Sequence, residues 1–320
     1  MVIQQSAKRA LVTGGAGFIG SHVAEAYLDA GYEVTVLDDL STGRREHVPQ
    51  GAKFVHAGVN DREARELLER GRFTVLNHHA AQMDVRVSVS DPLRDERINI
   101  AGLINLLEGA RVGGVQRVVF ASSGGVIYGD GESLPFSEQS RKLPVSPYGV
   151  SKLASEYYLA MYSTLHGLEV VSLRYGNVYG PRQNPHGEAG VVAIFSNRLR
   201  DREGLTIYGD GSQTRDYVFV GDVARANLMV SSGDPPTVNS IDDAAFNVGT
   251  GTETSVNDLA RMLLEIARAD VSVGHVDSRP GELLRSAVDS RKLTADRGWV
   301  PQVTLKDGLQ QTYEWVASCR

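Results

Sequence analysis

The sequence is poor in cysteine, in long apolar runs and in excess charge, and each shortage excludes a class of protein. Its single cysteine, Cys319, stands next to Arg320 and cannot form an internal disulfide or a metal cage, which favours a reducing compartment. No apolar run approaches the ~18 residues that span a bilayer, and Met1 to Arg9 lacks the apolar core of a signal peptide. We therefore expect a soluble, cytoplasmic protein with no membrane partner.

Neither charge sign dominates the composition. The 33 basic and 39 acidic side chains leave a net charge of -6, which argues against a nucleic-acid partner and favours a small molecule. Apolar residues make up 42% and charged residues 22% of the 320 positions, as in ordinary globular proteins with a sizeable core.

Short apolar runs recur along the first half of the chain, with helical stretches between them. Strands are predicted at residues 9–13, 33–37, 53–56, 73–77, 116–121 and 168–173, and helices at 18–30 and 98–112. Continuous apolar strands that alternate with helices are typical of a parallel sheet covered on both faces. We expect an α/β fold with a doubly wound, Rossmann-type parallel sheet.

The rhythm changes after Gly180, where residues 181–190 read as a long loop. Beyond the loop, the pattern predicts helices at 191–199, 256–267 and 305–316 and strands at 205–208 and 245–248. The predicted division is a Rossmann domain over residues 1–180, to which 219–231 return, and a smaller C-terminal lobe over 181–320.

A glycine-rich motif, TGGAGFIG at residues 13–20, follows the first strand and opens the first helix. Gly14 permits a tight turn, Gly17 lets the backbone approach a pyrophosphate, and Gly20 lets the helix pack closely on the strand. The helix start, at Phe18 and Ile19, offers unpaired N–H groups to phosphates. The motif predicts a dinucleotide site.

Asp38 follows the second predicted strand, 18 residues after Gly20. A carboxylate at this place can bond both ribose hydroxyls and would repel a 2′-phosphate, so NAD is favoured over NADP. Arg44 and Arg45 lie just downstream and keep NADP as an alternative.

A Tyr and a Lys four residues apart, Tyr148 and Lys152, share one face of a predicted helix. A phenol with a free pKa near ~10 is a poor base, but a nearby cation stabilises its phenolate. A Tyr and a Lys four residues apart, considered without other evidence, more often lie on a solvated helix face than in an active site. The prediction gains from Ser123, which follows a parallel strand and stands 25 residues before Tyr148; this spacing favours it over Ser122. Together the three residues suit proton and hydride transfer.

These motifs resemble the extended short-chain dehydrogenase/reductase family and, within it, the UDP-hexose 4-epimerases. The resemblance covers nearly the whole chain, through TGGAGFIG, VLDDLSTG, the SSGG run, YGVSK, LRYGNVYGPR, YGDGSQTRDYVFVGDVA and RPGE in family order. It implies an NAD-dependent isomerase that epimerises C4 of a UDP-sugar through a 4-keto intermediate. It also implies a C-terminal lobe that binds the nucleotide sugar, and a homodimer.

The resemblance further implies roles for residues that spacing alone does not single out. Asn99 would lie by the cofactor pocket, and Asn177 would face the sugar diphosphate. Arg215 and Arg279 would bind the diphosphate, although Arg215 with Asp216 also reads as a surface pair. The implied uridine-ribose ligand is Glu282, and the residue beside the sugar 2-substituent is Ser286, whose small size predicts turnover of N-acetylhexosamines.

Some positions depart from the family pattern. Family members usually carry an adenine-contacting aspartate after the glycine of the stretch at residues 54–61. This chain reads Ala57-Gly58-Val59-Asn60 there. A 4,6-dehydratase is disfavoured because Gly124-Gly125 replaces its Asp-Glu pair.

Other functions stay open. A UDP-glucuronate 4-epimerase or decarboxylase is one, since Arg86 or Arg182 could pair a C6 carboxylate, and a non-catalytic NAD-binding regulator is another. The sequence does not separate UDP from dTDP. His78 and His79 are predicted to pack beside the cofactor, because no third ligand follows at metal spacing.

Overall fold

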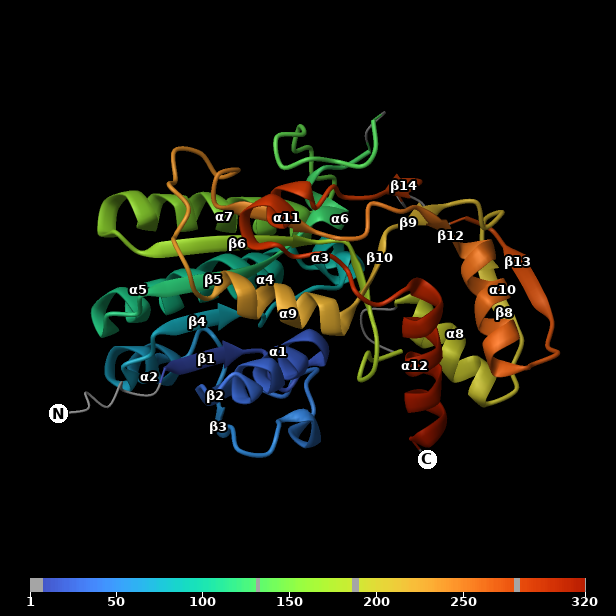
Figure 1. The fold of residues 1–320 in the computed structure, drawn as a ribbon, viewed down its shortest axis with the longest axis horizontal. Coiled ribbons are helices and arrows are strands. Elements are labelled where there is room, and N and C mark those ends of the chain that lie inside the picture. Colours follow the sequence, from blue (N-terminus) through green and yellow to red (C-terminus); the bar gives the residue numbers. More distant parts are fainter. Residues whose placement is uncertain (1–7, 131–132, 186–189, 279–282, 320) are drawn as a thin grey trace. The chain divides into compact units, whose positions relative to one another are not determined.

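The computed structural model describes residues 8–130, 133–185, 190–278 and 283–319. A seven-stranded sheet runs through it in the order β11-β6-β5-β4-β1-β2-β3 (Figure 1). Its strands are β1 (Arg9–Thr13), β2 (Glu33–Asp38), β3 (Lys53–His56), β4 (Val75–His78), β5 (Arg117–Ser123), β6 (Glu169–Tyr175) and β11 (Ala245–Val248). The pairs β1/β2, β1/β4, β2/β3 and β4/β5 are all parallel. The predicted Rossmann-type sheet is confirmed, and its order reverses beside β1, where such sheets bind ligands.

Helices cover both faces of this sheet. They are α1 (Phe18–Asp29), α2 (Arg62–Gly71), α3 (Val85–Ser90), α4 (Pro92–Glu96), the π-helical turn η2 (Arg97–Ala101), α5 (Gly102–Gly113), α7 (Pro147–His166) and α9 (Val220–Val230), with a 3-10 turn η1 (Arg45–His47). Apolar side chains of α2, α5 and α7 share one core with Leu76 of β4. The next residue, Asn77, points to the opposite face, where its amide donates to Tyr27 of α1 and Asn227 of α9.

Local signals explain where the longest helix begins and ends. The Ser146 hydroxyl accepts the backbone N–H of Gly149 at 3.1 Å, and Pro147 occupies the first turn of α7. Gly167 ends the helix in the left-handed conformation, with φ of 67°. These caps fix the position along the chain at which Tyr148 and Lys152 enter the helix.

The predicted strand at residues 245–248 is confirmed as β11. This strand, β11, lies at the edge of the seven-stranded sheet beside β6. All four of its residues are buried, and Ser172 donates its N–H to the carbonyl of Ala244 at 2.8 Å.

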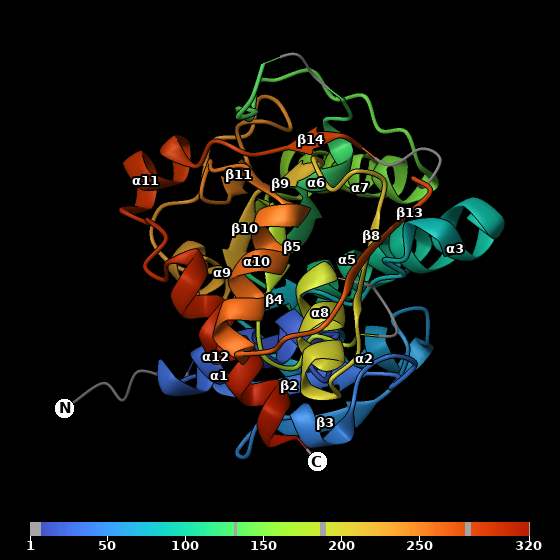
Figure 2. The same cartoon turned by 90° about the vertical axis from the view of Figure 1, so that its right-hand side faces the viewer.

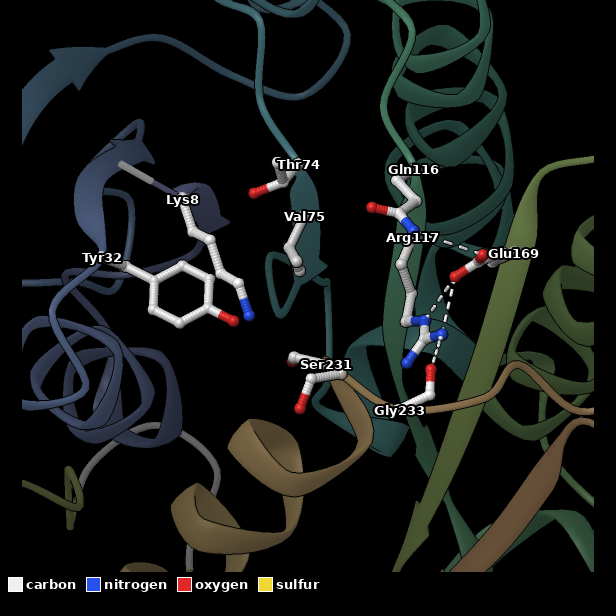
Figure 3. Close-up of a pocket in the computed structure, with 10 residues that line it drawn as sticks. Lys8, Tyr32, Thr74, Val75, Gln116, Arg117, Glu169, Ser231 and Gly233 are labelled. Atoms are coloured by element: carbon white, nitrogen blue, oxygen red, sulfur yellow. Dashed lines mark hydrogen bonds and ion pairs between the residues drawn. The ribbon is translucent and has the colours of Figure 1, made fainter. Parts of the chain in front are cut away.

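A buried arginine anchors the segment that leads back to this sheet (Figure 3). Arg117, at the start of β5, donates to the carbonyl of Val230 at 2.9 Å and to that of Gly233 at 2.7 Å, and it pairs with Glu169 at 2.7 Å. A cation at the last turn of α9 is favourable because the helix dipole is negative there. Arg117, Glu169 and Gly233 line a cavity of about 160 Å³.

The remaining elements are helices and short strands, and these strands form smaller sheets. They are α6 (Gly124–Ile127), β7 (Asn177–Tyr179), α8 (Val191–Arg200), β8 (Leu205–Tyr208), β9 (Thr214–Arg215), β10 (Tyr217–Phe219), β12 (Thr254–Ser255), α10 (Val256–Ala267), β13 (Val273–Val276), β14 (Arg285–Ser286), α11 (Arg291–Arg297) and α12 (Leu305–Ser318). Strand β9 lies between β12 and β14, β7 pairs with β10, and β8 pairs with β13. Helices α8, α10 and α12 pack on one another (Figure 2).

The chain forms two compact units that interleave in sequence. One holds residues 1–122, 146–173 and 224–245, and the other holds 123–145, 174–223 and 246–320. The predicted division after residue 180 differs from these limits, because the segment after β5 leaves the first unit early. None of the helices in the described parts of the chain is both long enough and apolar enough to cross a membrane.

Candidate active site

The glycine motif forms a tight turn between β1 and α1. Gly14 has φ of 67° and donates its N–H to the carbonyl of Leu37 at 2.8 Å. A Cβ at Gly20 would lie 2.2 Å from the carbonyl oxygen of Gly14, so a side chain there would push the helix off the turn. Both positions therefore require glycine.

The first turn of α1 is open to an anion. Its N-cap, Gly17, supplies no side-chain bond, and the first turn carries no acidic residue. The first N–H of the helix to find a helical acceptor is that of Ser21, which bonds Gly17. The N–H groups of Phe18 and Ile19 therefore have no acceptor within the helix, as a phosphate-binding helix start requires.

Asp38 is held beside this turn. Its two carboxylate oxygens accept the backbone N–H groups of Ala16 at 3.0 Å and Leu40 at 2.8 Å. Burial raises the pKa of the Asp38 carboxyl above its usual value, and the two N–H bonds oppose that shift. Each oxygen keeps a lone pair for a further donor such as a ribose hydroxyl.

The two arginines that kept NADP open have other partners. Arg44 donates to Glu46 at 3.3 Å, and the Arg45 guanidinium lies 4.3 Å from the ring centroid of Phe54. The geometry around Asp38 therefore favours a free 2′-hydroxyl.

Lys152 is buried against the phenol of Tyr148. Its Nζ donates to the carbonyl of Ala121 at 2.8 Å and lies 5.7 Å from the ring centroid of Tyr148. Only 4% of Lys152 is exposed, so the solvated helix face that spacing alone would suggest does not describe this pair. A buried ammonium stabilises negative charge on a neighbouring phenol oxygen.

The two histidines at the end of β4 are neutral near pH 7. Burial, with a smaller contribution from the charge of Lys152, lowers the pKa of His78 to about 3. Burial likewise lowers the pKa of His79 to about 3. The Nδ1 atom of His78 lies 2.7 Å from the hydroxyl oxygen of Thr13, which ties β4 to β1.

The two adjacent serines differ in their surroundings. Ser122 is buried and donates to Glu156 of α7 at 2.6 Å. Ser123 is the last residue of β5 and is half-buried, and its hydroxyl makes no hydrogen bond with any described residue. Of the two, only Ser123 keeps its hydroxyl available for a ligand.

Asn99 lies on η2 and is buried within the first unit. Its Oδ1 accepts the N–H of Gln82 at 2.9 Å, and its Nδ2 donates to the carbonyl of Gln82 at 2.8 Å and to Asp95 at 3.0 Å. Both amide hydrogens are thus used inside the protein. Asp95 and Gln82 were not singled out from the sequence, where nothing marks a polar contact between residues so far apart.

In the second unit, Asn177 and Arg215 line a cavity of about 720 Å³. Volumes of 300–1,000 Å³ are usual for small-molecule sites. Arg279 and Glu282 lie outside the described residues. Ser286 is buried on β14, in register with Arg215 of β9, and only 3% of it is exposed.

Asp216, next to Arg215, is a buried residue whose contacts the sequence did not reveal. The surface-pair interpretation of Arg215 with Asp216 is wrong, because the Asp216 carboxylate is buried. It accepts from the N–H and hydroxyl of Thr250 at 2.8 and 2.6 Å, and from the N–H groups of Gly251 and Val288 at 3.0 and 3.2 Å. Its own carbonyl accepts the N–H of Asn177 at 2.8 Å. Burial raises the pKa of this carboxyl.

Comparisons with known proteins identify the family of this chain. The model of the NAD dependent epimerase/dehydratase family matches residues 10–249. A Mycolicibacterium smegmatis protein named UDP-glucose 4-epimerase is 43% identical over 96% of this chain and 98% of its own. The Thermus thermophilus UDP-glucose 4-epimerase in complex with NAD has a TM-score of 0.89 and 44% identity, with 98% and 100% of the two chains covered. The Thermotoga maritima UDP-glucose 4-epimerase with UDP-glucose has a TM-score of 0.90 and 42% identity, with 96% and 98% covered. The chain belongs to the NAD dependent epimerase/dehydratase family.

Proposed function

We propose that this enzyme epimerises C4 of a UDP-hexose, interconverting UDP-glucose and UDP-galactose, and that it also accepts the N-acetylhexosamines. The observation that carries the proposal is the buried Lys152 beside Tyr148, in the unit that also holds the glycine turn. The relatives named UDP-glucose 4-epimerase support the choice of substrate.

The first unit has the features that NAD requires. The turn at Gly14 and Gly17 and the open start of α1 would hold the pyrophosphate, and Asp38 would hold a ribose. Bound NAD supplies an acceptor and donor of hydride at the sugar C4, so no second substrate is needed.

The acid–base step is assigned to the phenol of Tyr148. Tyr148 takes the proton of the sugar 4-hydroxyl as C4 is oxidised to the ketone. It returns the proton after the sugar has rotated to present its opposite face. Lys152 stabilises the phenolate by its buried charge, and the available hydroxyl of Ser123 donates to the same substrate oxygen.

The second unit is assigned the nucleotide sugar. Arg215, with the implied ligands Arg279 and Glu282, would hold the diphosphate and the uridine ribose, and Asn177 would face the diphosphate. Because the sugar must rotate in the pocket between the two hydride transfers, we expect strong binding of the nucleotide and looser binding of the hexose.

Local geometry weakens the rival reactions. A Cβ at Gly124 would lie 2.6 Å from a methyl group of Val288, so no acid residue fits where a 4,6-dehydratase carries its Asp. Arg86, offered for a C6 carboxylate, is paired with Asp84 at 2.7 Å. Neither observation favours a second function.

The proposal includes a homodimer and a cytoplasmic location. Helix α7 exposes Val150, Tyr157, Met161 and Leu165, and exposed apolar side chains grouped on one helix are typical of a protein interface. The single cysteine fits a reducing compartment. Sedimentation of the full chain would test the dimer, and a monomer at micromolar concentration would contradict it.

The test of the reaction is a panel of UDP- and dTDP-sugars with products identified by NMR. We expect UDP-galactose to give UDP-glucose, with no 4-keto-6-deoxy sugar and no decarboxylation. Tyr148→Phe should retain NAD and lose at least ~100-fold in turnover, the scale of a lost general base. Dehydration or decarboxylation by the wild type, or normal turnover in the variant, would contradict the proposal.

A further inference from the structure

A buried carboxylate in the first unit joins three segments of the chain. Asp95, on α4, is fully buried. Its Oδ1 accepts from the side-chain amides of Gln82 and Asn99, each at 3.0 Å, and its Oδ2 accepts from the hydroxyl of Ser151 at 2.5 Å. All three donors are neutral side chains, and no ion pair to Asp95 occurs in the described part of the chain.

Two of these donors fix the loop that follows β4. The backbone N–H of Gln82 donates to Oδ1 of Asn99 at 2.9 Å, and Nδ2 of Asn99 donates to the carbonyl of Gln82 at 2.8 Å. This loop packs on the glycine turn, because a Cβ at Gly14 would lie 2.6 Å from the backbone nitrogen of Ala80. The Asp95 cluster, formed by Asp95, Gln82, Asn99 and Ser151, thus supports the loop against which the turn is built.

The third donor lies on the helix of the proposed acid–base pair. Ser151 precedes Lys152 and is one helical turn after Tyr148, so its position sets the rotation of this part of α7. A second bond, from the Ser155 hydroxyl to the carbonyl of Asn99 at 3.3 Å, joins the same helix to η2. A small rotation of α7 would displace the phenol oxygen and the ammonium together.

We propose that Asp95 is a positioning residue, which holds the Tyr148–Lys152 turn of α7 in register with the glycine turn through Ser151 and the Gln82 loop. The inference rests on the proposed function where turnover is concerned, but the order of α7 can be measured without it. Positioning errors of about 1 Å cost on the order of 100-fold in rate.

Substitutions of Asp95 can distinguish the effect of its hydrogen bonds from the effect of its charge. In Asp95→Asn, the carbonyl oxygen can still accept from Gln82 and Asn99, while the new amide group can donate to the Ser151 oxygen. The substitution removes the charge and keeps all three links. Ser151→Ala removes only the link to α7, and Asp95→Ala removes all three.

The experiment compares these variants in the full chain, with Thr164→Ala as the matched control. Thr164 is exposed on the same helix and donates only to the carbonyl of Ala160, at 3.0 Å. For Ser151→Ala and Asp95→Ala we expect kcat on UDP-galactose to fall about 10- to 100-fold with KM within about 3-fold. Asp95→Asn should restore most of the turnover, and Thr164→Ala should match the wild type.

Amide hydrogen exchange of residues 146–156, measured without substrate, gives the independent measurement. Exchange there should be faster in Ser151→Ala and Asp95→Ala and unchanged in Asp95→Asn and Thr164→Ala. Unchanged exchange and unchanged kcat in a folded Ser151→Ala would overturn the inference. A turnover loss in Asp95→Asn equal to that in Asp95→Ala would also overturn it, because charge alone would then explain the effect. A wild type without epimerase activity would contradict the proposed function, and the exchange measurement would still decide the inference.

Discussion

Two adjacent serines should give opposite phenotypes when each is replaced by alanine. Ser122 donates to Glu156 at 2.6 Å in a buried pair, whereas the Ser123 hydroxyl has no hydrogen-bond partner among the described residues. Removing a donor from a buried carboxylate costs about 1–3 kcal/mol. At roughly 2–4 °C per kcal/mol for a domain of this size class, Ser122→Ala should lower Tm by several degrees. Its kcat should stay close to that of the wild type.

Ser123→Ala should show the reverse. Its Tm should stay within about 1–2 °C of the wild type, because no hydrogen bond within the protein is lost. A hydrogen bond to an oxygen that develops charge contributes about 1.5–3 kcal/mol, so kcat should fall about 10- to 100-fold. Thermal unfolding and turnover of UDP-galactose, measured on the same preparations, give both numbers. A large loss of kcat in Ser122→Ala with unchanged Tm, or normal kcat in Ser123→Ala, would refute the assignment.

Three further predictions test the cofactor site, the sugar pocket and the buried histidines. Asp38→Asn should lower the preference for NAD over NADP at least about 10-fold, as measured by calorimetric titration of both cofactors, and an unchanged ratio would refute the ribose assignment. Ser286→Tyr should abolish turnover of UDP-N-acetylglucosamine while it spares UDP-glucose, and kinetics of both sugars check this; equal effects on the two sugars, or a wild type inactive on the N-acetyl sugar, would mean that Ser286 is not the gate. Because the pKa values of His78 and His79 fall to about 3 on folding, the unfolded chain takes up their protons first, and stability should drop as pH falls below about 6.5. Urea unfolding between pH 7 and 5 should show this, with up to about 1.4 kcal/mol per pH unit for each histidine and a shallower slope in His78→Gln.

Patterns that act over a few neighbouring residues were predicted well from the sequence. Strands β1, β3 and β8 and helix α10 have the predicted limits, because runs of apolar residues between turn signals define them. The glycine turn was equally readable, since its requirement for Gly14 and Gly20 is steric and local.

Features that depend on contacts between distant residues were not predicted. The carboxylate of Asp95 meets Ser151 across 56 positions, and Asp216 meets Val288 across 72. An acidic residue between two short strands, such as Asp216, or in a short helix, such as Asp95, looks like a surface residue until its donors are known. Spacing favoured Ser123 over Ser122, but it did not reveal that Glu156, on another element, accepts from the Ser122 hydroxyl.

The measurement that tests the central claim most directly follows the hydrogen at C4. UDP-glucose that carries deuterium at C4 is incubated with the enzyme in ordinary water, and the product is analysed by NMR. If the C4 hydrogen leaves and returns as hydride within one active site, UDP-galactose should form with the deuterium still at C4. Deuterium lost to the solvent would mean that C4 exchanges a proton instead, and deuterium retained in unchanged UDP-glucose would mean that no epimerisation occurs. Either result would contradict the account.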